Sequence, residues 1–259
     1  TSQPFKIVAG GKYSFPDDSE LINGYTFVAT PLGNEGFVAE ALWASSSTSS
    51  KDLLDGTGTL KTKGSSNYWS FGISYPFILE RNSKLSISLN GTGQNSTNDL
   101  YLDGKHTTDL STDRIRALRL SVDGYLAKPT FVTSGSLRIS QGISGLGDSL
   151  SDNEFLSNPL GESDFTTSRL ELSHLQQLPI TGLKLHAKAS GQISSTALPV
   201  PEQFTYGGQS YGRAYKSVYI LGDHGWTASA ELNYPLKLRA GDNSTVTPFV
   251  WYDYGSTSY

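Results

Sequence analysis

The stretch "GLKLHAKASGQI" (residues 182–193) alternates between apolar or small side chains and polar side chains. Successive side chains of a β-strand point to opposite faces, so this pattern predicts a strand with one apolar and one polar face. The apolar face carries Leu183, Leu185, Ala187, Ala189 and Ile193, and the polar face carries Lys184, His186, Lys188, Ser190 and Gln192. The fold is therefore expected to be built from two-faced strands.

The same alternation recurs in "WSFGISYPF" (69–77), "KLSISLNGT" (84–92) and "ALRLSVDGYL" (117–126). Extending the search along the chain predicts about eleven strands. They lie near residues 4–14, 23–31, 36–49, 66–78, 84–97, 113–126, 129–143, 165–177, 181–196, 227–238 and 246–254.

The predicted connections alternate between short and long. Short ones such as "PLGNEG" and "LERNS" are typical of tight hairpins, whereas the long ones are expected to be loops. The long connections are residues 50–65, 98–112, 144–164 and 197–226. Short turns at one end and long loops at the other indicate an antiparallel up-and-down meander.

The composition agrees with an all-β protein and excludes several function classes. Of 259 residues, 27 are glycine and 14 are tyrosine, which favours strands and turns over helices. The 24 acidic and 20 basic residues are scattered along the chain, so no nucleic-acid-binding patch is predicted. The absence of cysteine excludes disulfides and thiolate chemistry, and no apolar run is long enough for a transmembrane helix.

Two architectures share this pattern. A soluble sandwich or small barrel would turn its apolar face inward, whereas a transmembrane barrel would turn that face to lipid and line its lumen with the polar one. The predicted strands are long enough to cross a bilayer, and Tyr75, Phe77 and Tyr234 lie toward strand ends, where barrels have aromatic girdles. Mixed charge on the polar faces suits a water-filled lumen. The predicted lumen-facing residues are Arg119, Asp123, Arg138, Arg169, Glu171, Lys184, His186, Lys188, Glu231 and Trp251.

At residues 170–215, "LELSHLQQLPITGLKLHAKASGQISSTALPVPEQFTYGGQSYGRAY", and at 221–236, "LGDHGWTASAELNYPL", the chain resembles the barrel of two-partner secretion transporters. These are the haemolysin and filamentous-haemagglutinin secretion or activation proteins of Gram-negative outer membranes. The stretch "FGISYPFILERNSKLSISLNG" (71–91) is similar to a strand, periplasmic turn and strand of that family. The resemblance runs from near residue 4 to the end and is most specific over 164–255.

The resemblance implies a transmembrane antiparallel barrel of about sixteen strands with periplasmic POTRA domains before it. Residues 1–259 are then expected to form part of a single outer-membrane β-barrel domain, without the POTRA domains and the first and last strands. Residues 197–226 correspond to the long extracellular loop that, in this family, folds into the pore.

The resemblance also implies a latch between that loop and the barrel wall. Gly212, Arg213, Ala214 and Tyr215 stand where the family has a Val-Arg-Gly-Tyr or Gly-Arg-Ala-Tyr signature. The family's arginine is expected to pair with a lumen-facing aspartate two strands later, and "WYD" supplies Asp253 there. The planar guanidinium suits this role because it binds a carboxylate through two hydrogen bonds.

No catalytic, cofactor-binding or metal-binding residue is predicted. The pair Asp223-His224 is interpreted as the start of a strand, where Asp223 satisfies backbone donors. The four histidines, at 106, 174, 186 and 224, lack the spacing of metal ligands, and no serine lies in a nucleophile-elbow pattern.

The function implied by the resemblance is translocation of a secreted exoprotein, of the haemolysin or adhesin type, through an outer-membrane pore without ATP. Its partners would be that exoprotein and the lipid of the Gram-negative outer membrane. One alternative in the same superfamily is a barrel-assembly insertase. Alternatives from other classes are a passive porin and a soluble β-adhesin.

Overall fold

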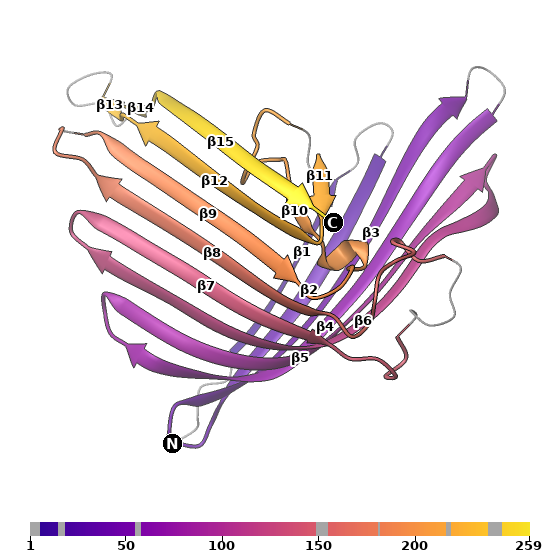
Figure 1. The fold of residues 1–259 in the computed structure, drawn as a ribbon, viewed down its shortest axis with the longest axis horizontal. Helices are drawn as coiled ribbons and strands as arrows, with labels where there is room; N and C mark the ends of the chain where they lie inside the picture. The colour runs from indigo at the N-terminus through magenta and orange to yellow at the C-terminus, as the bar shows by residue number, and fades with distance from the viewer. Residues whose placement is uncertain are drawn as a thin grey trace.

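Eleven long strands form one continuous antiparallel sheet in the computed structural model (Figure 1). The structure describes residues 6–14, 19–54, 58–148, 155–180, 182–215, 219–237 and 245–259. The strands of the large sheet are β1 (Lys6–Ser14), β2 (Ser19–Leu32), β3 (Phe37–Leu54), β4 (Gly58–Leu79), β5 (Ser83–Leu102), β6 (Lys105–Lys128), β7 (Phe131–Gly142), β8 (Thr166–Gln177), β9 (Lys184–Ser194), β12 (His224–Asn233) and β15 (Phe249–Ser258). Neighbours in this order pair in the sheet, so the predicted antiparallel meander is confirmed.

The short elements lie at the connections. A 3₁₀ turn, η1 (Val200–Glu202), precedes a two-stranded sheet of β10 (Phe204–Tyr206) and β11 (Ile220–Gly222). A second small sheet pairs β13 (Leu236–Lys237) with β14 (Thr245–Val246) between β12 and β15. None of the helical segments in the described ranges has the length and apolar character needed to cross a membrane.

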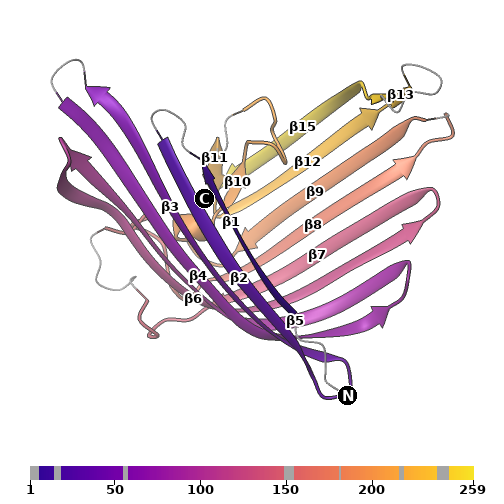
Figure 2. The same ribbon diagram turned by 180° about the vertical axis from the view of Figure 1, so that it is seen from behind.

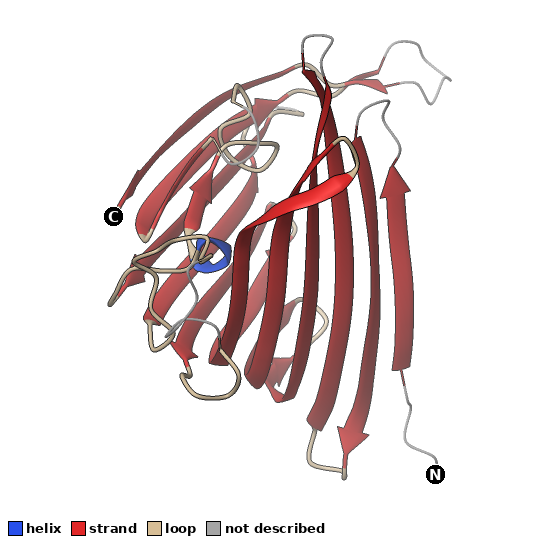
Figure 3. Cartoon of the chain, turned by 90° about the vertical axis from the view of Figure 1, so that its right-hand side faces the viewer, coloured by secondary structure: helices blue, strands red, loops and turns tan. Residues whose placement is uncertain are grey.

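The large sheet curls into a deep trough, with β1 and β15 at its two edges (Figures 1 and 2). The segment with η1, β10 and β11 lies on the concave side of this trough (Figure 1). Seen from the side, the strands nearest the N-terminus stand next to one another as a tall wall (Figure 3). The trough therefore has an inner surface that the long segment after β9 covers in part.

The distribution of side chains is the reverse of that in a soluble globular protein. Among the described residues, the buried set contains twelve polar or charged residues and only six hydrophobic ones. On β9 the polar residues Ser190 and Gln192 are 6% and 5% exposed, whereas Ile193 is 65% exposed. The polar face of the strands is thus the inner face, and the apolar face is the outer one, as in a transmembrane barrel.

Aromatic side chains border the outer apolar band. Trp43 and Trp69 are cross-strand partners on β3 and β4 at one border. At the other border, Tyr75 packs against both Phe37 and Phe77, with ring centroids 4.8 and 5.2 Å apart. Such girdles are found where a barrel meets the lipid–water interfaces.

Two predicted loops are wrong. Residues 50–65 and 98–112 were expected to be long connections, but β3 pairs with β4 as far as Leu54 and Gly58, and β5 pairs with β6 as far as Leu102 and Lys105. These strands run on beyond the Trp43–Trp69 border. The sequence there is rich in serine, threonine and charged residues, so the apolar alternation used to find strands disappears.

A third boundary differs by a few residues. The strand expected over residues 227–238 runs from His224 to Asn233 as β12. Gly222 lies in β11, and Asp223 separates the two strands. The long connection after β9 therefore occupies residues 195–223 of the chain.

Candidate functional site

The segment between β9 and β12 is attached to the inner wall by two aromatic side chains. Phe204 and Tyr206 of β10 are 1% and 6% exposed. A Cβ at Gly225 of β12 would lie 2.3 Å from the Phe204 ring, and one at Gly255 of β15 would lie 2.4 Å from the Tyr206 ring. Each ring therefore occupies space that only a glycine leaves free.

This contact predicts that Gly225→Val displaces the loop. The added side chain would overlap the ring of Phe204, and overpacking of this kind costs about 1–3 kcal/mol. Single-channel recordings in planar bilayers are expected to show a higher resting conductance than for the unmodified protein. Gly191→Val is the matched control, because a Cβ at Gly191 meets its nearest atom at 3.6 Å. Equal conductance of the two variants would contradict the seating of Phe204.

The tip of the segment turns at Gly212. Its φ is +71°, a left-handed conformation that glycine adopts without strain, and a Cβ there would lie 2.8 Å from the Tyr206 ring. The backbone N–H of Tyr215 donates to the Gly212 carbonyl at 2.9 Å, which closes a tight turn around Arg213. The turn presents the Arg213 side chain to strands β12 and β15.

Arg213 contacts Asp253 through both backbone and side chain. Its backbone N–H donates to Asp253 Oδ2 at 3.0 Å, while its Nε and Nη2 each donate to the same carboxylate at 3.3 Å. The Asp253 side chain is only 5% exposed. Such charge-assisted, bidentate bonds are among the stronger polar interactions in proteins.

Arg213 also binds two further residues of the wall. Its Nη1 donates to Glu231, and its guanidinium carbon lies 4.9 Å from the centroid of the Trp251 ring. Glu231 is held in turn by Asn233, whose Nδ2 donates to Oε1 at 2.9 Å. One arginine thus sits over an aromatic ring and faces two carboxylates, which raise the pKa of Arg213, Asp253 through its hydrogen bond most of all.

The other members of the predicted tip motif make different contacts. Ala214 and Tyr215 are exposed. Tyr215 stacks on Tyr219 with ring centroids 4.6 Å apart and contacts Tyr206 at 6.0 Å. Tyr211, just before the turn, lies in a recess with Glu171, and burial and this carboxylate raise its pKa.

The structure places the predicted lumen-facing residues on the inner face of the sheet, but only Glu231 and Trp251 among them contact Arg213 at the loop tip. Arg213, Glu231, Trp251 and Asp253 come together at the tip. Arg119 binds Glu202 near η1 instead. The remaining positions lie along the wall. Asp123 and Glu171 line the recess with Tyr211, and Arg138 and Arg169 line a recess near η1. His186 Nε2 lies 3.0 Å from Ser173 Oγ, and Lys184 and Lys188 share the face of β9 that carries His186.

Two acidic residues of this site have partners that the sequence did not identify. Glu202 was not singled out, because a carboxylate in an irregular segment has no periodicity to reveal its partner. Asp223 was expected to satisfy backbone donors, which is confirmed, but its side-chain partner was not foreseen. It accepts from the Leu198 N–H at 3.0 Å, and also from Gln203 Nε2 at 3.0 Å, so it joins the two ends of the segment.

One group of described residues has the composition of metal ligands. Asp99, His106 and Asp109 place their ligand atoms within 4.8 Å of one another near the far end of β5 and β6. His106 Nε2 lies 2.9 Å from Asp109 Oδ1, and both side chains are about half exposed. The contact between His106 and Asp109 is a solvent-exposed hydrogen bond on β6, and it involves none of the residues that bind Arg213.

Comparison with known proteins gives one family and several related structures. Residues 6–259 match the family described as haemolysin secretion/activation protein ShlB/FhaC/HecB. CdiB from Escherichia coli has a similar structure, with a TM-score of 0.74 and 19% identity over 97% of this chain and 45% of that one. CdiB from Acinetobacter baumannii gives 0.74 and 14% over 98% and 43%. The chain therefore spans less than half the length of these structures. A comparison with curated proteins gave no match.

Proposed function

The chain belongs to the haemolysin secretion/activation protein family, and from this premise we propose that it is the barrel wall of a transporter that passes a partner exoprotein across the Gram-negative outer membrane. The family is one of outer-membrane two-partner secretion transporters. In this proposal the described strands belong to a single barrel domain. The segment between β9 and β12 is its pore loop, and Arg213 with Asp253 is the latch of that loop.

The observation that carries the proposal is the position of the Arg213 loop against an inner wall of polar side chains. A polypeptide can pass through a pore in an extended state only if the wall gives it few apolar contacts. The buried wall residues Ser121, Ser140, Ser190 and Ser229 meet that condition, since each offers only a small hydroxyl. The loop crosses this wall and would restrict the resting pore.

The direction of transport in this proposal follows from the exoprotein. An outer membrane has no ATP supply, so the driving force must come from a difference between the state of the exoprotein in the periplasm and its state outside the cell. An exoprotein that folds outside removes the unfolded chain from the transport equilibrium, which makes its return unfavourable. The transporter then needs only to recognise the unfolded chain and open.

The test is secretion of an exoprotein encoded beside the transporter gene. We expect that co-expression of the two genes releases the exoprotein into the medium, and that deletion of the transporter gene leaves it in the periplasm. Immunoblots of medium and periplasm measure the distribution. Loss of other outer-membrane proteins on deletion would instead support an insertase. Steady conductance with no effect on the exoprotein would support a passive porin.

A further inference from the structure

We propose that the pore loop is attached at two independent places and opens as a hinged flap, with an ion pair between Arg119 and Glu202 keeping its base on the wall while the Arg213 tip leaves. The base comprises residues 197–206 and 220–223, and the tip comprises residues 209–215. The inference deepens the proposed transport function and rests on it.

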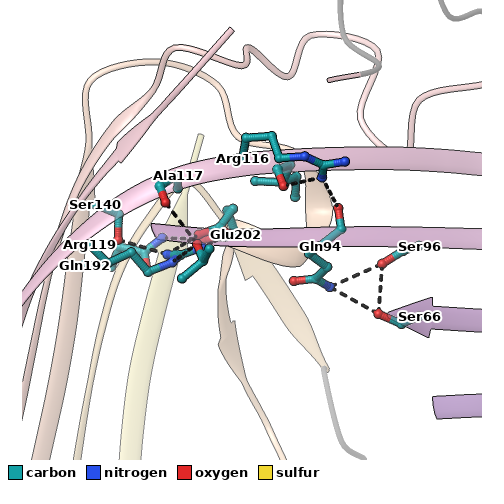
Figure 4. Close-up of polar contacts among 11 residues, drawn as sticks. Ser66, Gln94, Ser96, Arg116, Ala117, Arg119, Ser140, Gln192 and Glu202 are labelled. Carbon is teal, nitrogen blue, oxygen red and sulfur yellow. Dashed lines mark hydrogen bonds and ion pairs between the residues drawn. The ribbon is translucent and has the colours of Figure 1, made fainter. Parts of the chain in front are cut away.

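The ion pair at the base has the geometry of a strong attachment. Arg119 of β6 donates from Nη1 and Nη2 to the two carboxylate oxygens of Glu202, at 3.1 and 2.5 Å (Figure 4). Its remaining donors reach Ser140 Oγ at 2.9 Å and Thr92 Oγ1 at 3.0 Å. The side chains of Arg119 and Glu202 are 12% and 9% exposed, so water competes little for these bonds.

Hydrogen bonds from neighbouring strands hold the backbone around Glu202. Gln192 Nε2 of β9 donates to the Glu202 carbonyl at 2.9 Å and to the Asp223 carbonyl at 3.3 Å. Asp223 binds Leu198 and Gln203, as described above. Both chain segments of the base, residues 197–206 and 220–223, are thereby joined to β9 through Gln192.

The loop between β7 and β8 packs on the same base. Asn158 Nδ2 donates to the Leu198 carbonyl at 2.8 Å, and the Val200 N–H donates to Ser157 Oγ at 3.1 Å. Leu198 and Phe165 are fully buried in a small apolar cluster with Ile115 and Ala117 of β6. The base therefore has an apolar core as well as polar bonds, and the tip has no comparable cluster among the described residues.

Arg213 supplies the ion pairs that bind the tip to the wall. Arg213 is 23% exposed, about twice as much as Arg119, and Ala214 and Tyr215 beside it are exposed. Loss of the Arg213 contacts would weaken the attachment of the tip without affecting the bonds of Glu202, because the two sets share no residue. The two attachments can therefore break separately.

Glycines at the junction allow the tip to turn. The β10–β11 pairing closes the base as a neck, and the Tyr219 N–H donates to the Tyr206 carbonyl at 2.9 Å where the neck ends. Gly207 and Gly208 follow directly, with φ of +119° and +100°. Glycine changes between positive and negative φ at little cost, so a rotation of the tip about this pair leaves the neck intact.

The first experiment crosslinks each attachment separately in the protein expressed in outer membranes with its exoprotein. The 259 residues of this chain contain no cysteine that would compete with the introduced pairs. Ser96→Cys with Pro201→Cys crosslinks the base, because both residues line one recess. Ser136→Cys with Tyr211→Cys crosslinks the tip, because both line another. The crosslinker is a short bis-methanethiosulfonate, which a reductant removes.

We expect the crosslinked base to secrete at nearly the rate of its own reduced form. The crosslinked tip is expected to secrete at least about tenfold less than its reduced form, because a covalent bond at the tip prevents the displacement that opens the pore. Reduction should restore secretion. Equal loss of secretion from both crosslinks would overturn the flap, because the whole loop would then have to leave.

The second experiment tests the ion pair without any exoprotein. Glu202→Gln is expected to raise the resting conductance in planar bilayers, and the Ser96–Pro201 crosslink is expected to bring it back to the level of the unmodified protein. Exchange of the charges, Arg119→Glu with Glu202→Arg, should also restore it in part. Arg138→Gln is the matched control, because Arg138 lies on the same face and bonds Ser121 Oγ at 3.4 Å.

These outcomes separate the flap from the proposed function. An unchanged conductance in Glu202→Gln would overturn the role of the ion pair, whether or not secretion occurs. If the unmodified protein secretes no exoprotein but Glu202→Gln opens the pore, the transport function fails and the base attachment stands.

Discussion

Arg213→Ala is expected to abolish most secretion while leaving the barrel folded. The substitution removes three side-chain hydrogen bonds to Asp253 and Glu231 and the contact with Trp251. Hydrogen bonds to charged groups contribute about 1.5–3 kcal/mol each. A loss of about 3 kcal/mol shifts the closed-to-open ratio of the loop roughly a hundredfold. The loop would then no longer occupy the closed position from which the exoprotein displaces it, and secretion would fail at this step.

Three measurements check this expectation. Immunoblots of the medium report secretion, channel recordings report the resting conductance, which should rise, and heat-modifiable mobility in gels reports the folded barrel. Arg213→Lys should be intermediate, because lysine keeps the charge but cannot form the fork or stack on Trp251 as well. Arg138→Ala is the matched control. Normal secretion by Arg213→Ala would exclude a latch at this position.

Leu89→Arg is expected to destabilise the barrel by about 2–4 kcal/mol, which is the cost of an arginine on the lipid face near the bilayer midplane. Leu89 is 45% exposed and pairs with Ile73 and Leu120 in the middle of the outer apolar band. The neighbouring Ser88→Arg introduces the same charge on the inner face, where water can hydrate it. It should therefore change the stability much less.

Urea unfolding in lipid vesicles, followed by tryptophan fluorescence, measures the two stabilities. The outer and inner positions differ by one residue in one strand, so strand propensity and sequence context are nearly the same. Equal destabilisation by the two substitutions would contradict the assignment of the outer face to lipid.

The strands that cross the apolar band were predictable because lipid on one side and water on the other impose a period of two. All eleven were located, and the phase placed Asp253 inward. Beyond the band both faces of a strand meet water, so "SKDLL" (50–54) in β3 has no apolar alternation and was interpreted as a loop. For β5 and β6 a local signal existed. Asp103 and Gly104 have φ of +50° and +78°, and Asp-Gly favours such two-residue turns.

The site was less predictable than the fold. The pairing of Arg213 with Asp253 was expected only from the family resemblance, since 40 residues separate the two along the chain. Glu231 was expected on the inner face, but its contact with Arg213 depends on where the loop crosses the strands. Glu202 lies 83 residues from Arg119, and only the folded path of the loop brings them together.

The unequal lengths of the strands give the mouth of the trough a high side and a low side. In the proposed orientation, β3 continues about eleven residues past Trp43, or roughly 35 Å along the strand at about 3.3 Å per residue, whereas β12 is ten residues long in all. The inner surface of the high side is made of hydroxyl and amide groups, including Ser46, Thr48, Ser96 and Asn98. A polypeptide that leaves the pore would make few apolar contacts with these groups. On the side of β12 it would meet solvent sooner. The unequal strand lengths would thus direct the polypeptide to leave the pore on the side of the shorter strand β12.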